Sequence, residues 1–242
     1  MSKTKNQIFE EITSEMCSSG FQRIGKIPIF FEISPHKFIE FANFDLDQSY
    51  EHNIVNALSN AKRGLDCQLD LILLVIGYFN YSQSKKWGFP KKIELLNELG
   101  ILAPRILNKI NKQRNLLEHQ FVMPKRTEVE DFIDVSMLFL ASVEKYTNNF
   151  ISSIKFDNSS TKMTYLLYNT IEDQQLIVGL YPEKTWPGMK IIGNPFEENL
   201  KTSDESAKST SAFRPKLIDK FVWSAKDTDF KNILKLYLSF YN

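Results

Sequence analysis

"SYEHNIVNALSNAKRGLDCQLDLILLVIGYF", residues 49–79, is the stretch from which the fold is predicted. Its apolar residues recur at three- and four-residue steps, which is the spacing of one face of an α-helix. They are Ile54, Leu58, Ala61, Leu65, Leu69, Ile72, Leu73 and Ile76. Gly64 is the one weak point, because glycine is unfavourable inside a helix. We therefore predict a long helix whose second half is buried.

Neither the apolar end of this stretch nor the first residues of the chain indicate a membrane protein. Its strongest apolar run, residues 69–79, contains Asp70 and is far shorter than the roughly 20 residues that span a bilayer. The first residues, "MSKTKNQIFEEITSEM", lack the apolar core of a signal peptide. Cys17 and Cys67 form neither a metal-binding pattern nor a disulfide framework, so reduced thiols are expected. The sequence predicts a cytoplasmic protein without membrane contact.

Three further helices are predicted after this one. "KKIELLNEL", residues 91–99, is short and amphipathic, and Gly100 fits the position just beyond its end. "APRILNKINKQRNLLEHQ", residues 103–120, ends before Pro124, and residues 127–150 open with a capping-box-like pair, Thr127 and Glu130. Helices of unequal length joined by short loops predict an antiparallel bundle over residues 49–153.

The flanking segments read as smaller units. Residues 6–17 predict a helix and "IPIFFEIS", residues 27–34, a strand. Residues 163–181 predict a hairpin, residues 216–223 a strand, and residues 228–241 a final amphipathic helix. The predicted class is α+β: an antiparallel helical bundle with a small α+β accessory region. Its parts are an N-terminal helix and strand segment (1–48), the bundle (49–153) and a C-terminal domain (160–242). Whether the N-terminal strand joins the C-terminal sheet is left open.

Positive charge is concentrated in one segment of the chain, between residues 105 and 126. The formal net charge is only +1, so the chain as a whole is not a polycation. Between Arg105 and Arg126, however, six basic residues face one acid, Glu118, which leaves a local charge of +5. The basic residues are Arg105, Lys109, Lys112, Arg114, Lys125 and Arg126. A positive window of this size suits a phosphate backbone.

Arg114, Asn115 and His119 lie inside this window and carry the chemistry of a candidate site. Arginine can hold a phosphate through two N–H donors. Histidine near neutral pH can take a proton from a ribose 2′-OH or return one to a leaving oxygen. An asparagine amide can orient either group. These three side chains suffice for RNA cleavage without a metal ion.

A purely structural interpretation stands beside this one. Arg114 and Glu118 are four residues apart and can form an ordinary helix-surface pair, and the helix dipole alone favours His119 near a helix C-terminus. An ideal helix turns Arg114 and His119 about 140° apart, whereas Asn115 and His119 share a face. His36 and His52 are isolated, and no spacing predicts a metal site. Asp66 and Asp70 could orient the motif residues or be ordinary surface acids.

Residues 94–146, from "ELLNELGILAPRILNKINKQRNLLEHQF" to "SVEKY", resemble the second half of a HEPN domain. In that family a short helix ending in glycine precedes a helix ending in Arg-Asn-x-x-x-His, a loop with proline and a long closing helix. "NALSNAKRGLDCQLDLIL", residues 56–73, resembles the family's first helices. The resemblance implies a helical bundle that dimerises and sets two motif copies across a two-fold cleft. It also implies either a metal-independent endoribonuclease of toxin, antiviral or RNA-processing systems, or a relative that binds nucleotides or RNA without cutting.

We therefore expect a metal-independent endoribonuclease whose products carry a 2′,3′-cyclic phosphate. His119 would act as general base or acid, Arg114 would stabilise the phosphorane, and Asn115 would orient one of them. RNA-binding residues would be Lys109, Lys112, Lys125 and Arg126. The expected partners are RNA, a second copy of the chain and an antitoxin or defence-system protein, with no cofactor or metal. The alternative is a non-catalytic module that binds RNA or a nucleotide, or supports assembly.

Overall fold

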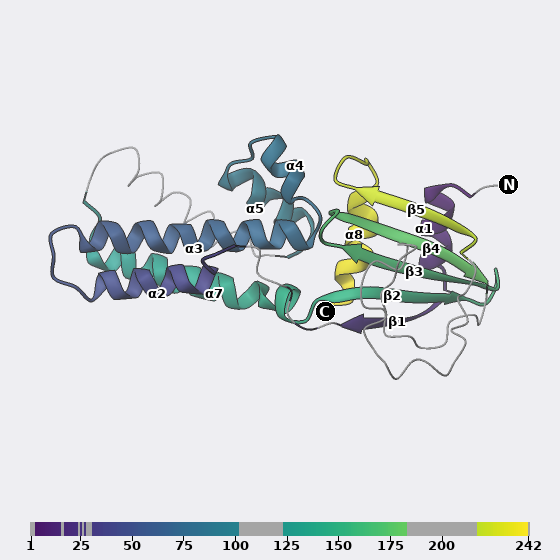
Figure 1. Cartoon of the computed structure of the whole chain (residues 1–242), viewed down its shortest axis with the longest axis horizontal. Coiled ribbons are helices and arrows are strands. Elements are labelled where there is room, and N and C mark those ends of the chain that lie inside the picture. Colours follow the sequence, from purple (N-terminus) through teal and green to yellow (C-terminus); the bar gives the residue numbers. More distant parts are fainter. Residues whose placement is uncertain are drawn as a thin grey trace.

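The computed structural model describes residues 3–15, 17–23, 25, 27, 31–101, 123–182 and 217–241. Figure 1 shows an elongated molecule with a helical region at one end and a sheet region at the other. The helical region consists of α2 (Pro35–Leu46), α3 (Asn53–Val75), α4 (Phe79–Ser84), α5 (Phe89–Glu98) and α7 (Arg126–Asn148). The sheet region consists of α1 (Lys5–Thr13), β1 (Cys17–Arg23), β2 (Ile151–Asn158), β3 (Met163–Thr170), β4 (Gln175–Pro182), β5 (Asp219–Ser224) and α8 (Phe230–Ser239).

The helical region is organised around α3, with α2 and α7 beside it (Figure 1). The hydroxyl of Ser34 caps α2 by accepting the backbone N–H of Lys37 at 3.2 Å. Gly64 lies on the buried face of α3, where an added Cβ would sit 3.0 Å from the carbonyl oxygen of Pro35 and 3.1 Å from Cδ1 of Ile39. The absent side chain thus allows α2 and α3 to approach closely, which offsets the low helix propensity of glycine.

α5 is held in place at both of its ends. Lys92 of α5 forms a hydrogen-bonded ion pair with Asp70 of α3. At the other end Gly100 has a φ of +73°, and the N–H of Ile101 donates to the carbonyl of Leu96 at 2.9 Å. This bond closes a helix-ending motif that requires a left-handed residue. The prediction that Gly100 ends this helix is confirmed.

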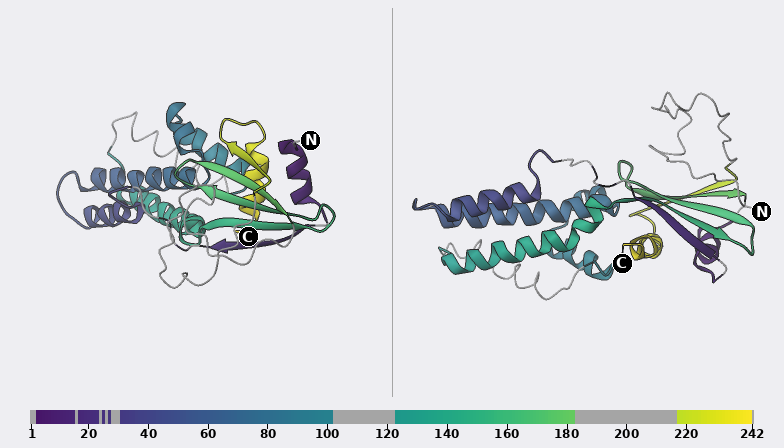
Figure 2. Two further views of the ribbon diagram at one scale, coloured as in Figure 1. Left: turned by 45° about the vertical axis from the view of Figure 1, so that its right-hand side comes forward. Right: turned by 90° about the horizontal axis from the view of Figure 1, so that it is seen from below.

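The sheet is fully antiparallel and has the strand order β1-β2-β3-β4-β5. Helices α1 and α8 cover the same face (Figure 2). Along β3, Tyr165 and Leu167 join the main core, whereas Leu166 and Tyr168 point to the opposite face and cluster with Tyr181. Both faces of the central strand are therefore buried.

One continuous apolar cluster joins the helical and sheet regions. It includes Leu69 and Phe132 from the helical region and Tyr165, Trp223 and Phe230 from the sheet region. Gly77 marks the junction: its φ is +75°, and an added Cβ would lie 3.1 Å from the carbonyl oxygen of Gln174 and 3.2 Å from Phe230. The two regions therefore share a core instead of being linked only by the chain.

The predicted architecture is wrong in its proportions. The five-stranded sheet is not a small accessory to a helical bundle, and the described fold is mixed α+β rather than an all-helical HEPN-like bundle. Two strands were missed. The polar sequence "CSSGFQR" of β1 gives no hydrophobic alternation, and β2 directly follows α7, where the helical pattern was read onward. Their pairing with each other supplies the regularity that neither sequence shows.

Some predictions of individual elements are wrong and others are confirmed. Of the predicted strand at residues 27–34, residues 28–30 lie outside the described residues, and the second half is wrong, since residues 31–33 form a bend and α2 begins at Pro35. The predicted capping box at Thr127 is also wrong, because Glu128 accepts the backbone N–H of Lys125 at 3.1 Å and α7 begins at Arg126. The first helix, the long helix, the hairpin, the 216–223 strand and the final helix are confirmed as α1, α3, β3–β4, β5 and α8.

Candidate functional site

The predicted catalytic residues Arg114, Asn115 and His119 lie outside the described residues, as do Lys109 and Lys112. The structure does describe the helices that precede and follow them. α5 ends at Glu98 and α7 begins at Arg126, and buried residues anchor both ends of the connection. These anchors are Leu99 and Ile101 at one end and Pro124 and Val129 at the other.

Lys125 and Arg126, the two described members of the predicted RNA-binding set, lie at the start of α7. Arg126 is already engaged: its Nη1 donates to the carbonyl of Leu46 at 2.9 Å and its Nε to Glu130 at 2.9 Å. These bonds tie the start of α7 to the end of α2. Lys125 is exposed. Of the two, Lys125 is therefore the side chain better placed to meet a phosphate.

The two other histidines have partners within the helical region. His36 of α2 pairs with Glu144 of α7 through its Nε2, at 2.5 Å. His52 precedes α3 and packs its ring against Tyr50, with 4.7 Å between ring centroids. The first contact joins α2 to α7, and the second is local to the start of α3.

Of the acids considered as orienting groups, Asp70 is committed to its ion pair with Lys92. Cys67 lies between Asp66 and Asp70 on α3. Burial, with the two nearby carboxylates, raises the pKa of the Cys67 thiol to about 11. A thiol in this state is a poor nucleophile at neutral pH. This stretch of α3 thus contributes packing and a buried ion pair.

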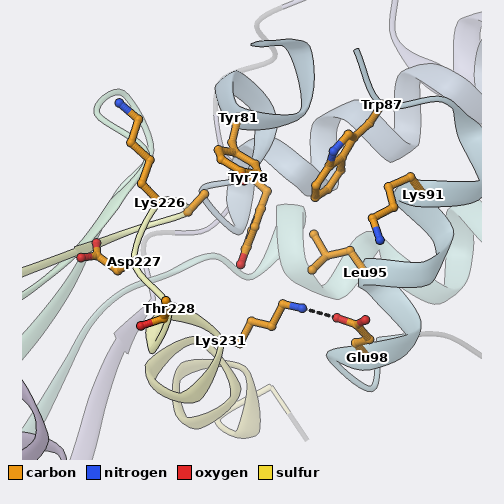
Figure 3. Close-up of a pocket in the computed structure, with 11 residues that line it drawn as sticks. Tyr78, Tyr81, Trp87, Lys91, Leu95, Glu98, Lys226, Asp227, Thr228 and Lys231 are labelled. Carbon is orange, nitrogen blue, oxygen red and sulfur yellow. Dashed lines mark hydrogen bonds and ion pairs between the residues drawn. The ribbon is translucent and has the colours of Figure 1, made fainter. Parts of the chain in front are cut away.

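A pocket of about 290 Å³ lies where α4 and α5 meet the loop between β5 and α8 (Figure 3). Three aromatic side chains, Tyr78, Tyr81 and Trp87, form one wall. The rings of Tyr78 and Trp87 are nearly parallel, at 23°, with centroids 6.1 Å apart. The rest of the lining comes from Lys91, Leu95, Glu98, Ala225, Lys226, Asp227, Thr228 and Lys231.

Charged groups surround the aromatic wall. Glu98 of α5 pairs with Lys231 of α8 across the pocket, the dashed contact in Figure 3. The hydrogen bond from Lys231 lowers the pKa of the Glu98 carboxyl, so the carboxylate stays ionised at neutral pH. Burial and the charge of Glu98 raise the pKa of Tyr78 to about 12. The pocket therefore offers a protonated phenol, an ionised acid and several ammonium groups at pH 7.

None of these pocket residues was predicted from the sequence. They come from segments more than a hundred residues apart, and only the folded chain brings Lys226 and Lys231 to Trp87. A signal was present in "GYFNYSQSKKWGFP", residues 77–90, where aromatic residues alternate with lysines and polar residues. That pattern is typical of a ligand-binding surface as well as of a core.

No family model, curated protein or solved structure matches the chain. Within the described residues, no three histidine, cysteine, aspartate or glutamate side chains gather as metal ligands. In the same part of the chain, every helix is too short or too polar to cross a bilayer. What the candidate sites can do must therefore be argued from their own chemistry.

Proposed function

We propose that this chain is a metal-independent endoribonuclease in which Arg114, Asn115 and His119 form the reaction site. The observation that carries the proposal is the placement of this motif within a +5 window between α5 and α7. The resemblance of residues 94–146 to a HEPN sequence belongs to the same proposal. It rests on the motif and its flanking helices and makes no claim about the rest of the architecture.

The order of the flanking elements supports the proposal. α5 is short and is followed by Gly100 just beyond its cap, and α7 is long and begins shortly after Pro124. This is the sequence of elements that surrounds the motif in the resembled family. The other two histidines, His36 and His52, contact Glu144 and Tyr50 and lie outside the motif.

Each motif residue has a role in the proposed reaction. His119 removes the proton from a ribose 2′-OH, whose oxygen then attacks the adjacent phosphorus. The P–O5′ bond breaks, a 2′,3′-cyclic phosphate remains, and the leaving 5′ oxygen takes up the proton that the imidazole returns. Arg114 stabilises the charge that develops on the phosphorane oxygens, and the Asn115 amide orients one of these groups. Lys109, Lys112 and Lys125 would hold the flanking phosphates.

A homodimer is part of the proposal, because one helix turns Arg114 and His119 apart. A two-fold interface that brings two motif copies to one cleft would supply both groups to one phosphate and double the local charge to about +10. A cytoplasmic setting fits the reduced thiols of Cys17 and Cys67, which form no disulfide. There the partner that restrains such an enzyme would be an antitoxin or defence-system protein.

The test is incubation of the purified chain with single-stranded and structured RNA in EDTA. Wild type should release products with 2′,3′-cyclic phosphate ends, and His119→Ala should lose at least about a hundredfold in rate. His52→Ala is the matched control, because it removes a histidine outside the motif and should retain cleavage. Undiminished cleavage by His119→Ala would contradict the assignment.

A non-catalytic module is the second candidate, favoured by the modest net charge of +1. In that case wild type would bind RNA with a marked salt dependence and yield no product under any metal condition. A chain that neither binds nor cleaves RNA would contradict both the nuclease and the RNA-binding module and leave nucleotide binding or assembly as the role of the patch.

A further inference from the structure

The size of the pocket in Figure 3 restricts what it can hold. Its volume of about 290 Å³ lies at the lower end of small-molecule sites, which run from roughly 300 to 1,000 Å³. Leu95 and the aromatic residues make part of the lining apolar, and charged groups come both from α5 and from the loop and helix that follow β5 (Figure 3). A single planar ring system with one polar extension fits this division.

The aromatic wall suits a flat, unsaturated ring. Tyr81 meets Trp87 edge-on, at 87° with centroids 5.7 Å apart, and this contact holds the half-exposed indole in a fixed orientation. Tyr78 is buried and is backed by Phe230, with centroids 5.3 Å apart. Rings fixed by such contacts lose little conformational entropy when a base stacks on them.

The charge of the lining favours an anion. Three lysines face two acids, and both acids already have cationic partners: Glu98 pairs with Lys231, and Asp227 pairs with Lys5 at 2.8 Å. Within the described part of the chain the ammonium group of Lys226 has no acidic partner, so an anion can reach it without breaking an ion pair. A cationic ligand would find no uncommitted carboxylate in the lining.

Hydrogen-bonding groups complete the arrangement. Among the described residues nothing pairs with the phenol oxygen of Tyr78, whose raised pKa keeps the O–H available as a donor. Glu98 offers a carboxylate oxygen that can accept a base N–H or a ribose hydroxyl. Donor, acceptor and ring surface thus lie within one small cavity, whereas Lys226 lines it from the loop between β5 and α8 and its ammonium group points away from the aromatic wall (Figure 3).

We infer that this pocket binds a nucleoside monophosphate unit, with the base against Tyr78 and Trp87 and the phosphate held by Lys226, whose exposed side chain turns toward the ligand on binding. The unit can be a free nucleotide or an unpaired nucleotide of RNA, since both present the same base, sugar and phosphate. The site shares no residue with the Arg114–His119 motif, so its occupancy does not depend on cleavage.

Calorimetric titration of the full chain with UMP, AMP, uridine and inorganic phosphate tests this inference. Both monophosphates should bind, and uridine more weakly, since it lacks the phosphate. Trp87→Ala should weaken UMP binding at least about fivefold, the lower end of what base stacking contributes, whereas Trp87→Phe should keep most of it. Lys226→Ala should weaken UMP binding and leave uridine binding unchanged.

The controls separate this inference from the proposed nuclease. Lys37→Ala removes an exposed lysine of α2 and should leave every affinity unchanged. His119→Ala should keep UMP binding even where it abolishes cleavage. A short oligouridylate that displaces UMP with higher affinity identifies RNA as the source of the nucleotide, and its failure to compete identifies the free nucleotide.

Two results overturn the inference. One is the absence of binding by UMP, AMP and oligouridylate at millimolar concentration to folded wild type. The other is UMP affinity that Lys226→Ala and the Trp87 variants leave unchanged. Lys226 is exposed on a loop, so its variant keeps the test decisive even if Trp87→Ala does not fold.

Discussion

The helical region and the sheet region are stabilised by different means. In the helical region, α2 and α3 approach closely at Gly64, where an added Cβ would meet the backbone of Pro35 at 3.0 Å. In the sheet region, directional bonds join the layers: the buried hydroxyl of Tyr237 donates to the carbonyl of Ile151 at 2.7 Å, and Asn158 donates to the carbonyl of Glu11 at 2.7 Å. The α2–α3 contact thus depends on shape and these contacts of the sheet region on hydrogen-bond partners, although both regions contribute to one apolar core.

Truncating the shared core should have the largest effect. Leu69→Ala removes a fully buried side chain and should lower the free energy of unfolding by about 2–5 kcal/mol. Because the core is continuous, the helical circular dichroism signal and the amide protection of β3 should be lost in one transition. Leu138→Ala, on the exposed face of α7, is the control and should change stability by less than about 0.5 kcal/mol. Two separate transitions would show that the regions unfold independently.

Filling the close approach should break the helical region selectively. Gly64→Ala should destabilise the protein by about 1–3 kcal/mol, because the methyl group would press against the Pro35 carbonyl and Ile39. Helix propensity alone predicts the opposite sign, by about 1 kcal/mol. Gly20→Ala in β1 is the matched control, since nothing lies within 4 Å of its added Cβ. Chemical denaturation of both variants gives the comparison. A gain in stability for Gly64→Ala would mean that the helices can separate at no cost.

Removing one hydroxyl should test the sheet region in turn. Tyr237→Phe keeps the buried ring but takes away the donor to the Ile151 carbonyl and the contact with the Tyr241 hydroxyl. Leaving buried polar groups with fewer partners should cost about 1–2 kcal/mol in thermal or denaturant unfolding. Tyr146→Phe is the control, because no hydrogen bond involves its hydroxyl in the described part of the chain. Equal effects for the two variants would remove the distinction between the regions.

Acidification should weaken the ion pair between Lys5 and Asp227 in the sheet region, with a smaller effect on stability than the substitutions above. Burial alone would raise the pKa of Asp227, but the hydrogen bonds from Lys5 and the Ser224 backbone outweigh it and lower the pKa below its ordinary 3.8. A lowered carboxyl pKa gives stability that is fully present above 3.8 and is lost as the pH falls through the folded-state value. Thermal unfolding of Asp227→Asn between pH 5 and pH 2 should therefore fall less steeply than that of wild type. Parallel curves would show that this ion pair adds no stability.

The two regions also differ in how many of their elements could be predicted from the sequence. The helices α3 and α5 follow from periodic apolar residues and from Gly100, which are local signals. β1 could not be predicted because its order comes from pairing Cys17 with Asn158 and Arg23 with Ile151, at the far end of the helical region. From the sequence alone Gly64 is predicted to weaken the helix. Its favourable effect, the close approach of α3 to α2, could not be predicted because the sequence does not show where α2 lies.

The candidate sites divide in the same way. The Arg-Asn-x-x-x-His motif is visible because its members lie within six residues. The proposed nucleotide pocket could not be predicted from the sequence, because Trp87 and Lys226 belong to separate segments. Tyr78 is also indistinguishable in the sequence from an aromatic residue of the core. Spacing reveals a candidate site whose members are close in the sequence, and only the tertiary structure reveals one assembled from several elements.

The pairing of Arg23 with Ile151 has a consequence for the order of events during synthesis. β1 and β2 are paired antiparallel, and the helical region is the segment of chain that connects them. During synthesis β1 can therefore pair with β2 only after the helices up to α7 have left the ribosome. Closing so long a loop as flexible chain would carry a large entropy cost. Helices that fold first as they emerge remove most of that cost, because they bring the N–H of Phe150 to the carbonyl of Gly25, at 3.0 Å in the finished protein. The helical region would then serve as the template on which the first and second strands find their register.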